Sequence, residues 1–310
     1  MSGHHSSIIA ICLALFIASV SRCPADDVQQ ATHVAPVRLP VPIDTDVVKF
    51  SQQPAVVGNR VAQQVELELN LDTTIVQSGQ VAAQQKSSMA RRQQRLVEVV
   101  EVEEGKVRRA RVTFSQSRQK SPDNENPEQE VIQPVEGKTY LLTRAGEQLL
   151  VTDSQGLIPP REEFEVVFSS MRSLGLPNPL AQFLLQNTFR VGQTLELPQE
   201  IASQMLGFGD ELGQVKKFEL RLEELSMHDG AQCAEFAATI KFAGGAENPM
   251  QVDVVGPVVV QTETCRTVMT DLTGPLALES EERTKMGNFT YQATGSMRAS
   301  IRARYASPNQ

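Results

Sequence analysis

The chain contains few side chains that could serve as a catalytic base. Its histidines are His4, His5, His33 and His228. A catalytic Ser or Cys needs a histidine or a comparable base within hydrogen-bond reach. His228 stands in the segment "SMHDGAQ", where Asp229 and Gly230 predict a tight turn, so we expect a solvated turn histidine there.

Motifs that carry enzymatic chemistry are absent from the sequence. It has no G-x-S-x-G nucleophile elbow, no H-E-x-x-H helix and no glycine-rich loop that would cradle phosphate. Acidic residues do occur as adjacent pairs, at Glu162-Glu163, Glu223-Glu224 and Glu281-Glu282. Adjacent residues of a strand point to opposite faces and cannot act on one bond. We expect no catalytic residue, no metal site and no cofactor; a hydrolase that relies on carboxylates alone is the remaining enzymatic alternative.

Two cysteines in the C-terminal half could form a disulfide. Cys233 and Cys265 would close a loop of about 30 residues, which the chain-entropy model values at about 3–4 kcal/mol. Two unpaired thiols are the alternative. Cys233 alternates in phase with Glu235, Thr239 and Lys241, which predicts that it faces away from the core. Because no histidine clusters with these cysteines, a zinc site is excluded.

The N-terminus predicts export to the periplasm or the cell exterior. Residues 8–20 form an uninterrupted apolar run that has the length of a signal-peptide core and is too short to span a bilayer. Residues 1–25 are therefore predicted to be a signal peptide, and a buried helix is the alternative. Cys23 would carry a lipid anchor if this segment were a bacterial lipobox, but Arg22 occupies the position that requires a small residue. The pattern disfavours the anchor.

The charge of the chain disfavours some classes of partner. The formal net charge is −8, which argues against nucleic acid or an anionic membrane surface. A local basic cluster consists of residues 89–99 ("MARRQQRLVEV") and Arg108, Arg109 and Arg111. Because acidic residues are interleaved with these arginines, we expect them to lie on a solvated strand face. No segment after the signal peptide has transmembrane length.

The rest of the chain reads as a tether followed by one domain. Residues 26–55 are rich in Pro, Gln and Asp without a period, which predicts a flexible tether. From residue 56 to 310, alternation of apolar and polar residues predicts about nine to eleven strands. Helical spacing is confined to a block at about 160–207. This order predicts an α+β domain with a large curved, half-barrel-like antiparallel sheet and centrally inserted helices.

Several positions punctuate the predicted strands. Hairpin turns are expected at Glu104-Gly105, Ala145-Gly146 and Asp229-Gly230, because such pairs accept left-handed backbone angles. A break in a strand is expected at Gly256-Pro257, since proline cannot donate to a sheet hydrogen bond.

The last predicted strand is long and has two distinct faces. Over residues 289–305, "FTYQATGSMRASIRARY", small or apolar residues alternate with polar or cationic ones. So much alanine and glycine on one face allows a helix to pack closely, or else leaves an apolar groove on a curved sheet. The groove candidates from the helices and this strand are Phe164, Phe168, Met171, Phe183, Phe289, Tyr291, Met297 and Ile301.

Two segments resemble exported bacterial domains of unknown function. The stretch "FRVGQTLELP" (189–198) matches a V-G-Q-T-W strand start, with Leu195 in place of the aromatic residue. The stretch beginning "DLTGPLALES" at Asp271 resembles a D-x-x-T-G strand end, with one residue fewer between Asp271 and Thr273. By fold analogy, the architecture that this resemblance implies is similar to the curved-sheet, half-barrel carriers of lipids and lipoproteins in the bacterial envelope.

Together these features predict an exported, non-catalytic binding protein. It would hold an apolar ligand, such as a lipid, or a lipidated partner between the curved sheet and the helices. The alternative is a structural or protein-interaction module that contacts envelope proteins and has no ligand cavity. A dry cavity would favour the first hypothesis, and a shallow, wet sheet face would favour the second.

Overall fold

The computed structural model describes residues 47–122, 129–206, 214–244, 250–284 and 287–306. The predicted signal peptide, Cys23 and most of the predicted tether lie outside these ranges. Within them, no helix is both long enough and apolar enough to cross a membrane.

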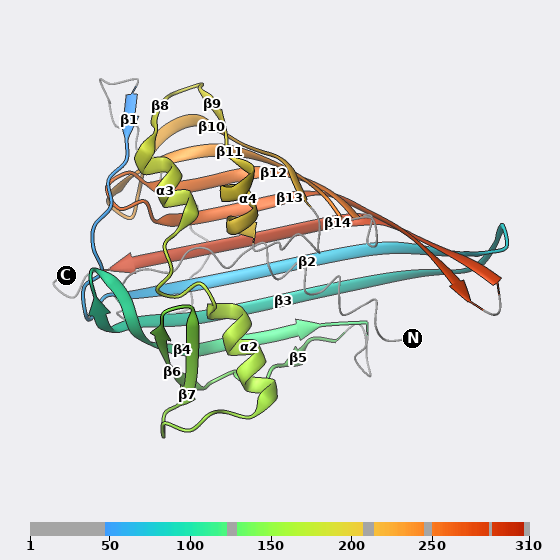
Figure 1. Cartoon of the computed structure of the whole chain (residues 1–310), viewed down its shortest axis with the longest axis horizontal. Coiled ribbons are helices and arrows are strands. Elements are labelled where there is room, and N and C mark those ends of the chain that lie inside the picture. Colours follow the sequence, from blue (N-terminus) through green and yellow to red (C-terminus); the bar gives the residue numbers. More distant parts are fainter. Residues whose placement is uncertain (1–46, 123–128, 207–213, 245–249, 285–286, 307–310) are drawn as a thin grey trace.

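The strands form a large antiparallel sheet that remains open and curves around three helices (Figure 1). Its order is β7-β6-β4-β3-β2-β14-β13-β12-β11-β10-β9, with β5 beside β4, and a separate small sheet pairs β1 with β8. This arrangement confirms the predicted α+β class with a curved antiparallel sheet. The strands are β1 (Val47–Lys49), β2 (Arg60–Gln77), β3 (Gln80–Glu103), β4 (Lys106–Lys120), β5 (Val131–Ile132), β6 (Thr139–Ala145), β7 (Gln148–Asp153), β8 (Thr188–Arg190), β9 (Thr194–Glu196), β10 (Gln214–His228), β11 (Ala231–Ala243), β12 (Met250–Gln261), β13 (Thr267–Thr284) and β14 (Gly287–Ala306).

Tight turns join most neighbouring strands. Glu104-Gly105 has φ angles of 50° and 74°, and Asp229-Gly230 has 49° and 77°, so both pairs adopt the left-handed backbone that matches hairpin twist. These turns and the reversal at Gly146 confirm the predicted hairpins. Ser78-Gly79 makes an equivalent turn between β2 and β3. That turn was not predicted, because the polar residues after it hide the alternation of β3.

Two expectations about the strands are wrong. β12 is continuous through Gly256-Pro257, and Pro257 stays in register with Ala237 of β11. The structure also describes fourteen strands, more than predicted. The additional ones are two or three residues long and too short to show an alternating pattern.

The last part of the predicted tether is built into the fold. β1 pairs antiparallel with β8, where Val48 lies opposite Phe189. Phe50, which follows β1, is buried and packs edge-on against Phe189 with ring centroids 5.6 Å apart. A strand of three residues leaves no periodic pattern in the sequence, which explains why this anchoring point was not predicted.

Three helices cover one face of the sheet, which we call the inner face (Figure 1). They are α2 (Arg161–Met171), α3 (Pro179–Gln186) and α4 (Gln199–Leu206), all within the predicted helical block. α3 begins with proline at its first position, and the Asn178 side chain caps it by accepting from Leu180 N at 3.0 Å.

The helices divide the apolar interior into two clusters. The first core cluster lies beneath α3 and α4 and joins Leu184 and Ala202 to Met297 of β14. The second core cluster lies beneath α2 and joins Met171 to Leu142 of β6. Both clusters are sealed, since most of their members expose less than a tenth of their surface.

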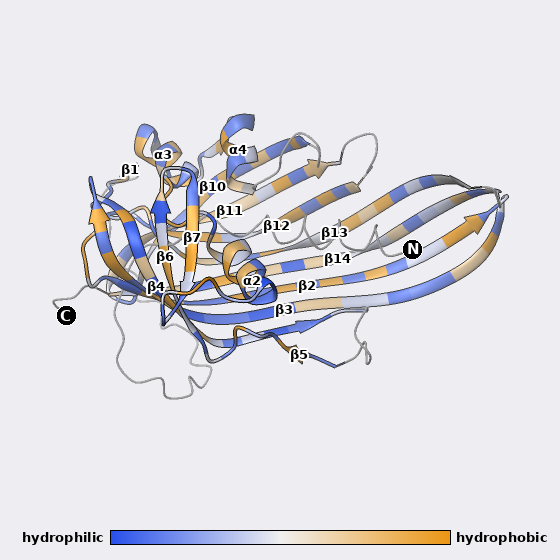
Figure 2. Ribbon diagram, turned by 60° about the horizontal axis from the view of Figure 1, so that its bottom comes forward, coloured by the Kyte–Doolittle hydropathy of each residue, from blue (hydrophilic) through white to orange (hydrophobic). Residues whose placement is uncertain are grey.

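Four strands extend past the helices as an arm. It consists of residues 71–77, 80–89, 276–284 and 287–295, and Figures 1 and 2 show it projecting from the helix-covered part of the molecule. Along the arm, β14 stays paired with β2 as far as Phe289, which lies opposite Gln77. Its inner face presents half-buried Ile75 and Tyr291 beside smaller residues.

Three adjoining strands each contain a glycine where a neighbouring backbone approaches closely. These glycines are Gly256 of β12, Gly274 of β13 and Gly295 of β14. A Cβ atom built on each would lie 1.9 Å from a carbonyl oxygen of the adjacent strand. No side chain fits there, so the close backbone approach at the base of the arm depends on glycine.

We predict that Gly295→Ala destabilises the protein, because its Cβ would collide with the Asn70 carbonyl and force the β14–β2 pair apart. The expected loss is about 1–3 kcal/mol of unfolding free energy, the usual range for overpacking. Urea denaturation measures it, with Thr294→Ala on the exposed outer face of the same strand as the control. Equal midpoints for the two variants would contradict the prediction.

Candidate functional site

The eight groove candidates do not line a common cavity. Met171 belongs to the second core cluster, and Phe183 and Met297 belong to the first. Phe289 and Tyr291 are half-buried on the arm, beyond the helices. The structure therefore distributes these residues over two packed clusters and a projecting surface.

The remaining candidates lie near α2 and in the centre of the sheet. Phe164 and Phe168 stack with their ring centroids 5.6 Å apart. Phe164 packs against the second core cluster, whereas Phe168 is 39% exposed. Ile301 is buried on β14 between the two clusters. Ala299 and Ala303 on the same strand belong to the first and second clusters, so the small residues of β14 mostly form a floor under packed side chains.

Between the two clusters, the inner face of the sheet is less well covered. Along β2, Val61 and Leu69 are buried, but Val65 and Leu67 between them are half-buried. On β3, half-buried residues stand opposite Leu69 and Leu67. We call the set of half-buried residues the middle strip; it consists of Val65, Leu67, Met89 and Arg91.

Two arginines of β3 point to this inner face. Arg91, Gln93 and Arg95 alternate along the strand in phase with the buried Val97 and Val99. Gln63 of β2 lies opposite Arg95, and its Oε1 accepts from Arg95 Nε at 2.9 Å. The inner-face neighbours of the two guanidinium groups are therefore a mixture of neutral polar residues, such as Gln93 and Gln63, and apolar residues, such as Leu67.

Ser170 of α2 connects the two arginines. Its backbone oxygen accepts from Arg95 Nη1 at 2.9 Å, and its hydroxyl accepts from Arg91 Nη2 at 2.9 Å. With the Gln93 amide oriented to satisfy both of its ends, its oxygen accepts from Arg91 Nη2 at 2.8 Å and its nitrogen donates to Ser170 at 3.1 Å. All of these acceptors are neutral.

Burial weakens the protonated form of both arginines. It lowers the pKa of Arg91 to about 10. Burial, together with the positive charge of Arg91, lowers the pKa of Arg95 to about 9. Among the described residues, no carboxylate forms an ion pair with either guanidinium. Both groups still carry a positive charge near neutral pH, in surroundings that disfavour it.

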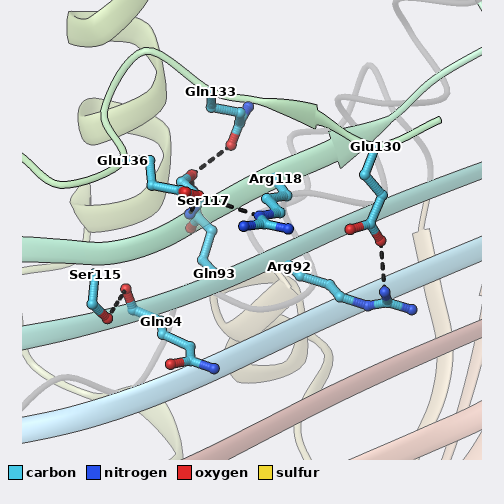
Figure 3. A network of polar contacts seen from close by, with 9 residues as sticks. All are labelled: Arg92, Gln93, Gln94, Ser115, Ser117, Arg118, Glu130, Gln133 and Glu136. Atoms are coloured by element: carbon cyan, nitrogen blue, oxygen red, sulfur yellow. Dashed lines mark hydrogen bonds and ion pairs between the residues drawn. The ribbon is translucent and has the colours of Figure 1, made fainter. Parts of the chain in front are cut away.

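The other arginines of the basic cluster are paired on the opposite face. Arg92 donates to Glu68 at 3.0 Å. It also donates to Glu130 at 2.6 Å (Figure 3). Arg109 pairs with Glu101 at 3.0 Å, and Arg108 and Arg111 also pair with glutamates. The prediction of a solvated strand face is thus right for Arg92 and wrong for Arg91 and Arg95, which the two-residue alternation with Val97 and Val99 places on the inner face.

A polar network on β4 supports Gln93 from its other side. Ser117, which lies opposite Gln93, donates its hydroxyl to Gln133 at 2.7 Å, and its backbone N–H donates to Glu136 at 2.8 Å (Figure 3). Glu136 also approaches Arg118 at 3.6 Å. Segment 129–138 therefore holds β4, the neighbour of the arginine-bearing strand β3, through contacts with Ser117 and Arg118.

The C-terminal end of α2 is held by arginines of the sheet. Its last turn contains no basic residue, yet helix C-termini favour cations. Arg95 bonds to the Ser170 oxygen. Buried Arg144 of β6 donates to the oxygens of Leu174 at 2.8 Å, Glu147 at 2.9 Å and Arg172. Part of the charge of Arg95 is consequently offset by the helix dipole, whereas Arg91 contacts only a hydroxyl and an amide.

A separate cleft of about 1160 Å³ opens where the connection between α2 and α3 meets the ends of several strands. Apolar contributions come from Val107, Leu176 and Tyr305, and charged ones from Lys106 and Arg266. Its walls are mostly turns and loops, and no cluster of three or more potential metal ligands occurs among the described residues.

His228 and the two cysteines are placed differently from expectation. The His228 ring is 18% exposed and lies 3.0 Å from the Glu235 carboxylate, so it is a paired rather than a solvated histidine. Cys233 and Cys265 are free and buried. Cys233 does lie on the face opposite the first core cluster, but it is fully covered there. Burial raises its pKa to about 12 and that of Cys265 to about 11, the reverse of nucleophile activation.

Comparison with known proteins gives little. No family model matches the chain, and no curated protein matches it in sequence. Among solved structures it is similar to a structure of lipovitellin that concerns lipid–protein interactions, with 9% identity and a TM-score of 0.37. The match covers 81% of this chain and 26% of that chain. A likeness at this level supports no conclusion about this protein.

We predict that both buried thiols are unreactive in the folded protein. At pH 8 neither Cys233 nor Cys265 should react with Ellman's reagent, because both are covered and their raised pKa values keep them protonated. In denaturant without reductant, both should react at once. If they stay unreactive in denaturant and react only after reduction, the two cysteines form a disulfide.

We predict that Arg144→Met destabilises the attachment of α2. The substitution leaves three carbonyl oxygens without their buried donor, at a cost of about 2–4 kcal/mol in unfolding free energy. Arg161→Met, which removes a solvent-exposed pair with Glu165, is the control and should leave the urea midpoint unchanged. Similar midpoints for both variants would show that Arg144 does not hold the helix end.

Proposed function

We propose that the protein is an exported, non-catalytic binding protein that holds an apolar ligand, or the lipid chain of a partner, on the inner face of its sheet. The observation that carries this proposal is the middle strip. Its apolar members Val65, Leu67 and Met89 are only half-buried, and Leu67 and Met89 pack against the margin of the first core cluster. Burying a fully exposed side chain of this size gains about 1.5–3 kcal/mol. These half-buried side chains gain the part that corresponds to their remaining exposed surface, so a ligand that covers the strip has a driving force for binding.

The shape of the sheet supports the same proposal. The sheet is open and curved, and its helices cover the inner face in two separate patches (Figure 1). Buried Ile301 continues the apolar floor from Val65 onto β14, where the two residues are paired. A ligand lying across β3 and β2 would contact the half-buried side chains of both strands, above this floor.

The arm favours a second candidate, a protein-interaction module. Pairing of β3 with β4 ends at Ala90 opposite Lys120. From Gln80 to Met89, β3 pairs with β2 on one side and with no described strand on the other. Such an edge can accept a strand from another protein. Its polar character and the exposed Lys86 protect it from indiscriminate pairing.

We predict that a lipid or another apolar molecule accompanies the protein when it is purified from its own host. Native mass spectrometry, followed by organic extraction, should reveal a bound species of defined mass, because the middle strip gains from burial. A protein that is free of ligand and also fails to bind a fluorescent fatty-acid probe would refute the carrier function and leave the interaction module.

Leu67→Asn tests the location of the ligand. A polar side chain in the middle strip should weaken binding of the fatty-acid probe by about tenfold or more, from the lost apolar contact. Glu66→Gln, on the opposite face of the same strand, is the matched control and should bind normally. Thermal melting confirms that each variant is folded. Normal binding by a folded Leu67→Asn variant would place the ligand elsewhere, with the cleft lined by Leu176 and Tyr305 as the next site to test.

A further inference from the structure

The middle strip contains one charged group whose environment is incomplete. Arg91 lies opposite Leu67 on the inner face, and Met89 follows it on the same face. Among the described residues, its Nη1 atom has no hydrogen-bond partner, and its Nη2 atom contacts only the neutral Ser170 and Gln93. Arg91 itself is half-buried, so a molecule lying on the strip can reach it.

The residues around Arg91 increase the local positive charge. Arg95 follows on the same face of β3, and both arginines bind Ser170, through its hydroxyl and its carbonyl oxygen. A carboxylate that faces Arg91 from α2, β2 or β4 would balance this positive charge. The groups there are Ser170, Gln63, Leu67, Ser117 and Gln119, none of which is anionic.

An uncompensated pair of this kind favours a bound anion. Separating two cations from water without a counter-ion is costly, and a carboxylate or phosphate in the site offsets part of that cost. Guanidinium groups present planar donors that match the oxygens of both anions. By comparison, the arginines on the outer face at the same level, such as Arg92, already have glutamate partners.

We propose that Arg91, with Arg95 behind it, receives the carboxylate or phosphate head of an amphiphile whose apolar chain lies along Leu67 and Val65. This inference rests on the proposed binding function and specifies the ligand class. The anion is attached to an apolar chain, because Arg91 lies beside the half-buried apolar side chains of Leu67 and Met89 as well as beside its polar partners Ser170 and Gln93.

Arg91→Met is the variant that tests this assignment. It should lower the affinity for a fluorescent palmitic acid analogue by about tenfold or more, since a charge-assisted hydrogen bond is lost. Affinity for the methyl ester of the same analogue should stay unchanged. Arg91→Lys should retain part of the preference for the acid. Arg92→Met, which removes a positive charge from the outer face of the same strand, should behave as the unmodified protein does.

Stability provides a second measurement. Because the charge of Arg91 has no counter-ion, Arg91→Met should leave the melting temperature of the ligand-free protein unchanged or raise it. The palmitic acid analogue should then raise the melting temperature of the unmodified protein but not that of Arg91→Met. A variant that melts well below the unmodified protein without ligand would show that Arg91 is a structural residue, and would overturn the assignment.

The outcomes separate this inference from the proposed function. Equal binding of acid and ester by the unmodified protein, or loss of both in Arg91→Met, overturns the anion site while leaving the binding function intact. If neither analogue binds, the proposed function fails as well. Inorganic phosphate alone should displace the acid only at much higher concentration. If inorganic phosphate binds as tightly as the acid, the site binds a free anion, and the proposal of an amphiphilic ligand is overturned.

Discussion

The inner face of a broad open sheet must be covered, and the helices of this protein are too short to cover it completely. A sheet of twelve strands presents an apolar face far larger than α2, α3 and α4 can shield, since these have 11, 8 and 8 residues. They seal it in two places and produce two core clusters. The half-buried strip between the clusters, and the arm that extends beyond the three helices, both follow from this shortage of helix.

The two faces of the sheet handle charge in different ways. On the outer face, arginines meet carboxylates on neighbouring strands, as Arg298 does with Asp271 at 2.9 and 2.6 Å. Such pairs contribute little to stability at the surface but keep a wide sheet hydrated. On the inner face, arginines bind neutral oxygens and the end of α2 instead. Fastening the end of α2 by its carbonyl oxygens places Arg95 and Arg144 in the interior, whereas Arg91 beside Leu67 contacts only the Ser170 hydroxyl and the Gln93 amide.

Strand alternation made the class of fold predictable from sequence, because a sheet with one buried face imposes a period of two over long segments such as β14. The hairpin turns at Glu104-Gly105 and Asp229-Gly230 were predictable as well, because these residue types favour left-handed backbone angles. Very short strands such as β1 leave no period and were missed. The candidate site was harder to find, because the alternation of β3 continues with Arg95, Gln93 and Arg91 after Val97. Arg91 and Arg95 alternate in phase with the core-facing Val97 and Val99, but their charge led to the prediction that they are solvated. The groove candidates on α2, α3 and β14 could not be assigned to common or separate clusters without the helix positions.

The middle of the sheet is closed by strands from opposite ends of the chain, since β14 lies between β13 and β2. Most other neighbouring strands of the sheet are consecutive in sequence and form hairpins, which can fold locally. The exceptions are β4 with β6 and β9 with β10, which are joined by longer connections. Each half can therefore organise early, but β2 retains a long unpaired edge until β14 arrives. Closure of this seam requires contacts of very high sequence separation, which are slow to form. The incompletely folded protein is accordingly most exposed to aggregation along β2, and a chaperone that binds extended strands would act on that edge.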